Sequence, residues 1–194
     1  MKNLNTTKAI LLGAIFLASC SLTSLAQNNK PRESTVASVT QRIGTDTDVT
    51  INYSWPPVKG RKIWGDVVPY GMSPGNKWSK DKPYPWRAGA NENTTIEINN
   101  DVIVEGQKLP AGKYGLHMIP SEKEWVVIFS KNNSSWGSFS YNQEEDALRV
   151  TVTPVKAEHQ EWLTFGFDDL STNAATAWLH WEKLKIPFKI QAVN

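Results

Sequence analysis

The sequence is poor in cysteine and in long hydrophobic runs. Its one cysteine, Cys20, lies near the start of a chain of 194 residues. The domain that follows residue 26 therefore has no disulfide and no thiolate chemistry. The apolar run at residues 9–18, "AILLGAIFLA", is too short to span a bilayer as a permanent helix. These shortages exclude a disulfide-stapled scaffold and give no sign of a membrane-spanning helix.

The same apolar run follows Lys2 and Lys8 and precedes small residues, which is the arrangement of an export signal. We expect residues 1–26 to be a signal peptide that is cleaved after Ala26, in "SLAQ". The alternative is a lipoprotein signal of residues 1–19, because "LASC" would place an acyl group on Cys20. Both routes predict an exported protein, periplasmic or secreted, and the second route anchors it to a membrane surface.

An excess of charge of one sign is absent after residue 26. Removing residues 1–26 leaves 194 − 26 = 168 residues, and 21 − 2 = 19 basic residues then face 19 acids. A near-neutral domain lacks the electrostatic attraction on which nucleic acids and anionic membranes depend. We therefore expect no nucleic-acid partner, and membrane contact only through a lipid on Cys20.

A helical stripe of apolar residues is also missing, and the dominant hydrophobic period is two, which is typical of strands with one buried face. The clearest alternation is in "DVTINYS" (48–54), "ALRVTVT" (147–153) and "KIPFKI" (185–190). Further strands are expected at 36–43, 94–98, 102–105, 114–119, 124–129, 162–168 and 175–182. A single turn of helix at 144–147 is the only helix expected.

Polar turn sequences such as "TDTD" and "NND" separate these strands at short intervals, which favours an antiparallel meander. The predicted fold is all-β: a single-domain antiparallel β-sandwich or jelly-roll-like barrel over residues 34–194. Residues 27–33 are polar and broken by proline, and we expect them to form a flexible leader. A chain of this length is sufficient to bury one full core.

Residues 56–85 interrupt the alternation with a long stretch rich in Pro, Gly, Lys and Trp. Such long loops within compact domains are usually functional or disordered. The aromatic residues of this stretch supply apolar surface that needs burial, which argues against disorder. We expect one long ordered loop excursion that lies across one end of the sandwich.

Several segments, in this order, resemble one family: "PVKGRKIWGDVVPYG", "WRAGANENTT", "VEGQKLPAGKYGLHMIP", "EWVVIFSKN" and "WGSFSY". They are similar to the domain-of-unknown-function family 2911, found mostly in exported bacterial proteins, and the resemblance covers about Ser34 to Ile190. It implies an exported all-β domain and supplies no established activity. The stretch "MSPGNKWSKDKPYP" (72–85) is an insertion relative to plainer members of the family.

The segment "WRAGANENTT" (86–95) has two interpretations. In the structural one, Gly89 supplies an unusual backbone angle, Asn91 and Asn93 fasten their own turn, and Arg87 braces the loop through carbonyls or a carboxylate. In the functional one, Arg87 presents a planar fork to a carboxylate or phosphate, Asn91 adds an amide, and Trp86 offers a stacking face. Isolated Arg-Asn loops are more often architectural, because buried polar groups are usually satisfied within the protein.

Tryptophan is the strongest anomaly of composition, with nine in the chain. Alternation places Trp125, Trp162 and Trp181 on core faces, and Trp136 fits as a cap on an adjoining turn. Four more cluster in or beside the excursion: Trp55, Trp64, Trp78 and Trp86. Aromatic rings on loops suit stacking against sugars or a protein partner, and about half of this cluster could equally form the loop's own small core.

Signals for catalysis are scarce. No "GxSxG" motif is present, and serines such as Ser138 lack a base that the sequence reveals. The adjacent acids at 144–145 and 168–169 are typical of solvated turns rather than of paired catalytic carboxylates. His117 and His180 are far apart in sequence, and they would form a metal site only if neighbouring strands brought them together with an acid such as Glu182.

The sequence therefore predicts a non-catalytic binding or structural module of the cell envelope with no cofactor. Its expected interaction surface consists of Trp64, Trp78, Trp86, Arg87 and Asn91, and its expected partner is a carbohydrate or an envelope protein. Two alternatives stay open. One is a metal- or carboxylate-dependent enzyme with its site on an inner sheet face, and the other is self-association through the edge strand at 36–43.

Overall fold

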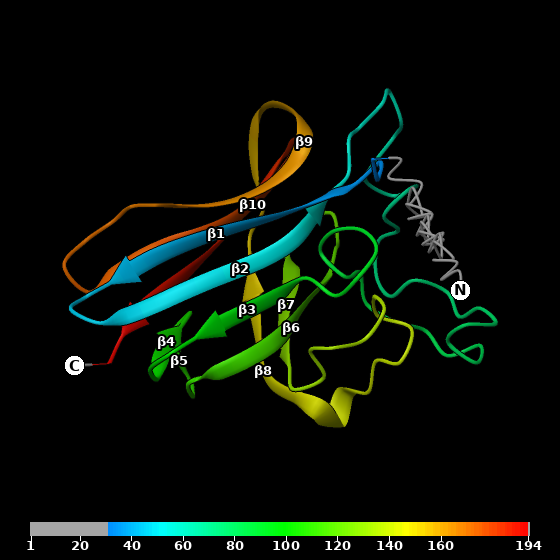
Figure 1. Ribbon diagram of the computed structural model, residues 1–194. Coiled ribbons are helices and arrows are strands. Elements are labelled where there is room, and N and C mark those ends of the chain that lie inside the picture. Colours follow the sequence, from blue (N-terminus) through cyan, green and yellow to red (C-terminus); the bar gives the residue numbers. More distant parts are fainter. Residues whose placement is uncertain (1–30, 194) are drawn as a thin grey trace, which may run out of the picture. The chain divides into compact units, whose positions relative to one another are not determined.

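The computed structural model describes residues 31–193 (Figure 1). Residues from Arg32 onward form one compact unit. The expected signal peptide, Cys20 and the first part of the leader lie outside the described residues. Within residues 31–193, no helix has both the length and the apolar character needed to cross a bilayer.

Ten strands build the described part of the chain, with one 3₁₀ turn, η1 (Gln143–Glu145), near the predicted helical turn. The strands are β1 (Thr35–Ile43), β2 (Thr47–Trp55), β3 (Thr95–Ile98), β4 (Val102–Val104), β5 (Gln107–Leu109), β6 (Gly112–Ile119), β7 (Trp125–Ser130), β8 (Asp146–Val152), β9 (Val155–Asp168) and β10 (Ala174–Ala192).

These strands form two antiparallel sheets. One has six strands in the order β1-β2-β3-β6-β7-β8, and the other has four in the order β5-β4-β10-β9. Over residues 31–193 the sheets stay separate, so the predicted sandwich is confirmed and the closed-barrel alternative is not. β1 lies at an edge of the larger sheet, as was expected for the strand at 36–43.

The core lies between the sheets because alternate residues of each strand point inward. In β2 the buried side chains Val49, Ile51 and Tyr53 share one face. The Tyr53 ring packs edge-on against Phe165 of β9, with centroids 4.9 Å apart. Contacts of this kind join the inner faces of the two sheets. They form because the predicted alternation places the apolar residues of each strand on its inner face.

β10 is one long strand where the sequence predicted two, at 175–182 and 185–190. The pairing with β9 shifts register on both sides of Glu182, whose φ is 54°, so a β-bulge lies there. The left-handed backbone conformation of Glu182 coincides with a reversal of the alternation within β10: Trp181 is buried before it, and Ile186 is buried after it. The sequence prediction was wrong because a reversal of the buried and exposed positions within one strand resembles a turn between two separate strands.

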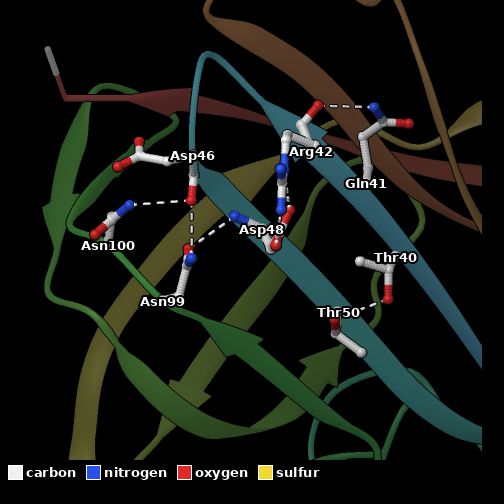
Figure 2. Close-up of polar contacts among 8 residues, drawn as sticks. All are labelled: Thr40, Gln41, Arg42, Asp46, Asp48, Thr50, Asn99 and Asn100. Atoms are coloured by element: carbon white, nitrogen blue, oxygen red, sulfur yellow. Dashed lines mark hydrogen bonds and ion pairs between the residues drawn. The ribbon is translucent and has the colours of Figure 1, made fainter.

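Side chains from two neighbouring turns fasten one end of the larger sheet (Figure 2). The Arg42 guanidinium donates two hydrogen bonds to the Asp48 carboxylate across the β1–β2 hairpin, at 2.7 and 2.6 Å. The Asn99 Oδ1 atom accepts from the Asp48 N–H at 2.7 Å, and its Nδ2 donates to the Asp46 carbonyl at 2.8 Å. Asn100 Nδ2 also donates to the Asp46 carbonyl, at 3.2 Å. The predicted "TDTD" and "NND" turns are therefore joined by hydrogen bonds.

The excursion between β2 and β3 is ordered and bridges the two sheets at their other end (Figure 1). At its start, the Val58 N–H donates to the Glu161 carbonyl of β9 at 2.7 Å. Beyond residue 85, Trp86 exchanges backbone hydrogen bonds of 2.9 and 2.8 Å with Met118 of β6. The excursion therefore connects the smaller sheet to the larger one, and its own side chains can enter the core.

Candidate functional site

Four indoles meet where the excursion enters the sandwich, and we call them the tryptophan cluster: Trp64, Trp86, Trp125 and Trp181. The centroid of Trp64 lies 5.0 Å from that of Trp125 and 5.8 Å from those of Trp86 and Trp181. Trp64 and Trp86 are each only 9% exposed. These two side chains were expected on the interaction surface, but they belong to the main hydrophobic core.

Arg87 has the contacts of a brace. Its Nη1 donates to the Asn91 carbonyl at 2.7 Å, and its guanidinium carbon lies 5.0 Å from the centroid of the Phe139 ring. A Cβ on Gly137 would lie 2.4 Å from the same guanidinium carbon, so only glycine leaves room for it. Burial lowers the pKa of Arg87. Glu92, a carboxylate of the same loop, pairs with Arg32 at 2.6 Å and not with Arg87.

The glycine and the asparagines of this loop act differently from the structural interpretation given above. Ala88 and Asn91, rather than Gly89, have positive φ, at 51° and 62°. A Cβ on Gly89 would lie 2.8 Å from Thr94 Oγ1, so glycine is required for close packing of the loop on itself. Asn91 Nδ2 donates to the Ser34 carbonyl at 3.2 Å, so it fastens a distant segment rather than its own turn.

A second aromatic group faces solvent, and we call it the Trp78 surface: Trp78, Ser135, Trp136, Phe139 and Ser140. These residues line an open concavity of about 680 Å³. Trp78 is 68% exposed and Trp136 is 59% exposed. Trp78 was among the predicted contact residues and lies on this concavity, whereas Trp136 was expected only to cap a turn.

The insertion at 72–85 is folded so that it presents Trp78. Asn76 Oδ1 accepts hydrogen bonds from the N–H groups of Trp78 and Ser79, at 2.8 and 3.1 Å. Ser73 and Tyr84 exchange two backbone hydrogen bonds, of 2.8 and 3.1 Å, which close the base of the loop. The Tyr84 ring packs edge-on against Phe139 at 5.1 Å. The insertion is thereby held against the loop that carries Trp136.

The two candidate histidines have different surroundings. His117, on β6, is 2% exposed, and its Nδ1 lies 2.8 Å from Ser138 Oγ. Burial, with a contribution from the positive charge of Arg87, lowers the pKa of His117 to about 4. His180, on β10, lies 2.9 Å through Nε2 from the Glu158 carbonyl. Within residues 31–193, no three His, Cys, Asp or Glu side chains are placed to hold a metal ion, so the convergence that the alternative metal site needs is not found.

Ser138 is hydrogen-bonded to His117, a partner that the sequence could not reveal because 21 positions separate the two residues. A serine nucleophile needs a base, and it also needs access for a substrate. Ser138 is 1% exposed, and His117 is nearly as buried. We therefore interpret the pair as two buried polar groups that satisfy each other where the 131–142 loop packs on β6.

The acids considered for catalysis are also engaged elsewhere or lie in turns. Asp168 forms an ion pair with Lys185, which lowers the pKa of the Asp168 carboxyl. Glu144 and Glu145 belong to η1. No feature of these acids in the described structure points to a catalytic pair.

A more polar pocket of about 560 Å³ lies beside the start of the excursion, and we call it the Arg61 pocket. Its lining includes Lys59, Arg61, Tyr84, Trp86, Arg87 and Asn91. Three of the residues predicted for the site, namely Trp86, Arg87 and Asn91, therefore border one pocket. Trp64 and Trp78 do not line it.

Residues 34–190 match the family described as protein of unknown function (DUF2911). The chain belongs to the DUF2911 family. The match covers most of the sandwich and both candidate surfaces, which confirms the resemblance seen in the sequence. Neither the curated proteins nor the solved structures include a match to the chain. For this DUF2911 protein, function must therefore be argued from the surfaces themselves.

Proposed function

We propose that this DUF2911 protein is an exported, non-catalytic carbohydrate-binding module, and that its ligand stacks on Trp78 and Trp136. The observation that carries the proposal is the presence of two largely exposed indoles on one open concavity. Exposing two large apolar rings is unfavourable unless a ligand covers them. The apolar C–H faces of sugar rings fit such indoles while their hydroxyls stay hydrogen-bonded.

Polar groups around the indoles favour a sugar over a purely apolar ligand. Ser135 and Ser140 line the same concavity, and their hydroxyl oxygens are 2.8 Å apart. A second concavity of about 800 Å³ shares Trp78, Phe139 and Ser140 with the first and adds Asn142 and Gln143. Amide groups beside an aromatic wall are suited to bonding sugar hydroxyls, so the two concavities together fit an extended oligosaccharide.

Titration calorimetry of the mature domain with a panel of soluble envelope and plant oligosaccharides tests this proposal. Trp78→Ala and Trp136→Ala are each expected to weaken binding by at least about tenfold, the equivalent of about 1.4 kcal/mol. Trp162→Ala is the matched control, since Trp162 is a partly exposed indole of β9, 37% accessible. Affinity that is unchanged in both surface variants, or lost in the control as well, would refute the assignment.

The export part of the proposal rests on the composition of residues 1–26. Expression of the full chain in a bacterial host, followed by fractionation and mass determination of the mature N-terminus, tests it. Cleavage after Ala26 predicts a free N-terminus at Gln27, and the lipoprotein route predicts acylated Cys20 that Cys20→Ser abolishes. Full-length protein retained in the cytoplasm would contradict both routes.

A further inference from the structure

The Arg61 pocket carries an excess of positive charge that the protein does not neutralise. Three basic side chains, Lys59, Arg61 and Arg87, line it together with one acid, Glu33, so the net charge of its lining is 3 − 1 = +2. The acid is a weak counterion. The Glu33 side chain is 85% exposed, and its oxygen is 3.5 Å from Lys59 Nζ.

Both guanidiniums of the pocket are held by carbonyls rather than by carboxylates. Arg61 donates through Nε to the Val58 carbonyl at 3.0 Å and through Nη2 to the Pro57 carbonyl. Arg87 donates to the Asn91 carbonyl. In the described part of the chain neither arginine has an ion pair, and the sequence before residue 31 contains no acid. Carbonyls orient a guanidinium without cancelling its charge.

Arg87 makes the charge imbalance costly. The side chain is partly buried, and burial lowers its pKa, which means that its charged form has lost solvation. Buried charges in proteins are normally paired. An arginine has five N–H donors in a planar fork, and only one of those of Arg87 has a hydrogen-bond partner in the described structure. Bound anionic oxygens would supply what the protein lacks.

The backbone of the pocket also departs from ordinary geometry. Lys59 and Asn91 both line the pocket, and both have positive φ, at 48° and 62°. Strained residues of this kind tend to occur at ligand sites, where the surrounding structure holds them in place. Two such residues from distant parts of the sequence border the same volume.

We propose that the Arg61 pocket binds a small molecule through an oxyanion group, a carboxylate or a phosphate, held by Arg61, Arg87 and Lys59. The planar fork of arginine matches the geometry of both groups. A volume of about 560 Å³ is within the range of small-molecule sites. The site is separate from the Trp78 surface and does not depend on the carbohydrate proposal.

Titration calorimetry of the mature domain with inorganic phosphate, and separately with malonate, tests the site. Saturable 1:1 binding of at least one anion is expected, and added salt should weaken it. Preference for phosphate indicates a phosphorylated ligand, and preference for malonate indicates a carboxylated one. Absence of saturable binding for both anions at millimolar concentration would overturn the proposal.

Variants then assign the binding to this pocket. Lys59→Gln and Arg61→Gln are each expected to lower the affinity for the anion by about tenfold or more. The Lys59 backbone N–H, which donates to Glu161 Oε1 at 2.8 Å, is unaffected by the first change, so that variant keeps its fold. Arg61→Lys should recover only part of the affinity, because it keeps the charge and loses the fork.

Lys62→Gln is the matched control, because it removes the same charge from the adjacent residue and does not line the pocket. The Lys62→Gln and Trp78→Ala variants should both bind the anion with the affinity of the wild type. If Lys59→Gln and Arg61→Gln bind like the wild type, or if Lys62→Gln is equally impaired, the anion binds elsewhere and the assignment is wrong.

Discussion

At the residue scale, three parts of the protein surround the guanidinium of Arg87. Phe139 covers it, Gly137 leaves room for it, and the Asn91 carbonyl accepts one of its hydrogen bonds. The structural interpretation of Arg87 as a brace thus agrees with its contacts, and the same side chain still borders the Arg61 pocket. Bracing and ligand binding are compatible because the fork has more donors than the loop uses.

Arg87→Ala is expected to lower the free energy of unfolding by about 2 kcal/mol, the scale of a hydrogen bond that involves a charged group. Arg87→Lys should restore little of this, since an ammonium group lacks the planar fork of the guanidinium. Urea denaturation measures both. Arg42→Ala is the control: Arg42 is an exposed partner of Asp48, and its loss should cost clearly less than the loss of Arg87. Equal losses for Arg87→Ala and Arg42→Ala would contradict the brace.

His117 predicts a pH dependence of stability. Its pKa is lowered from 6.5 to about 4 by burial. Between these values the unfolded chain binds a proton that the native state does not, so stability is present above pH 6.5 and is lost as the pH falls toward 4. His117→Gln should flatten this part of the stability curve by up to about 1.4 kcal/mol per pH unit.

Denaturation at a series of pH values measures the slopes. Acidic groups also titrate in this range, so the quantity of interest is the difference between variant and wild type. A His117→Gln curve parallel to the wild type would mean that the pKa of His117 is not lowered in the native state.

At the element scale, the sequence predicted strands wherever one face is buried and alternation is unbroken, as in β2. It failed where tertiary structure changes the pattern. The alternation reverses within β10 near Glu182. Trp162 was expected in the core, yet it is 37% exposed and packs beside Trp55, at 5.0 Å between centroids. β5 was missed because three residues, Gln107–Leu109, carry too little periodicity to be recognised.

The contact between the β1–β2 and β3–β4 turns (Figure 2) gives a prediction with a neighbouring control. Asn99 uses both ends of its amide, to the Asp48 N–H and to the Asp46 carbonyl, whereas Asn100 makes one longer bond to that carbonyl. Asn99→Ala should lower the free energy of unfolding by about 1–2 kcal/mol, and Asn100→Ala by less than half of that. Urea denaturation compares the two, and a larger loss for Asn100→Ala would show that these bonds do not hold the turns together.

The insertion at 72–85 is a separable element, because Ser73 and Tyr84 already pair at its base. Replacing residues 74–83 by Asn-Gly should close this base with a tight turn. We expect the far-UV spectrum to be kept and binding at the Trp78 surface to be lost, since Trp78 lies in the removed segment. Circular dichroism and the oligosaccharide titration measure the two. A shortened chain that folds and still binds with the wild-type affinity would place the ligand elsewhere.

At the scale of the whole molecule, the sequence could identify aromatic residues on the excursion but could not sort them. Trp64 and Trp78 are only 14 positions apart in comparable surroundings, yet one joins the core and the other faces solvent. Which indole is buried depends on the path of the excursion across the open end of the sandwich. Backbone hydrogen bonds between Trp86 and Met118 help to fix this path. Such long-range geometry leaves no local periodicity, so the Arg61 pocket and the role of Trp136 could not be predicted either.

The tryptophan cluster makes the excursion part of the same cooperative unit as the sheets. Trp64 from the excursion packs against Trp125 of β7 and Trp181 of β10, so the cluster cannot open without disturbing both sheets. We expect near-UV circular dichroism, to which packed indoles contribute, and far-UV circular dichroism to lose their native signals at one urea midpoint. Trp64→Ala should lower the free energy of unfolding by about 3–5 kcal/mol, whereas Trp136→Ala, which removes an exposed indole, should change it by less than about 0.5 kcal/mol. A near-UV transition that precedes the far-UV one would show that the excursion melts as a separate layer, and the burial of Trp64 would then contribute little to the stability of the sandwich.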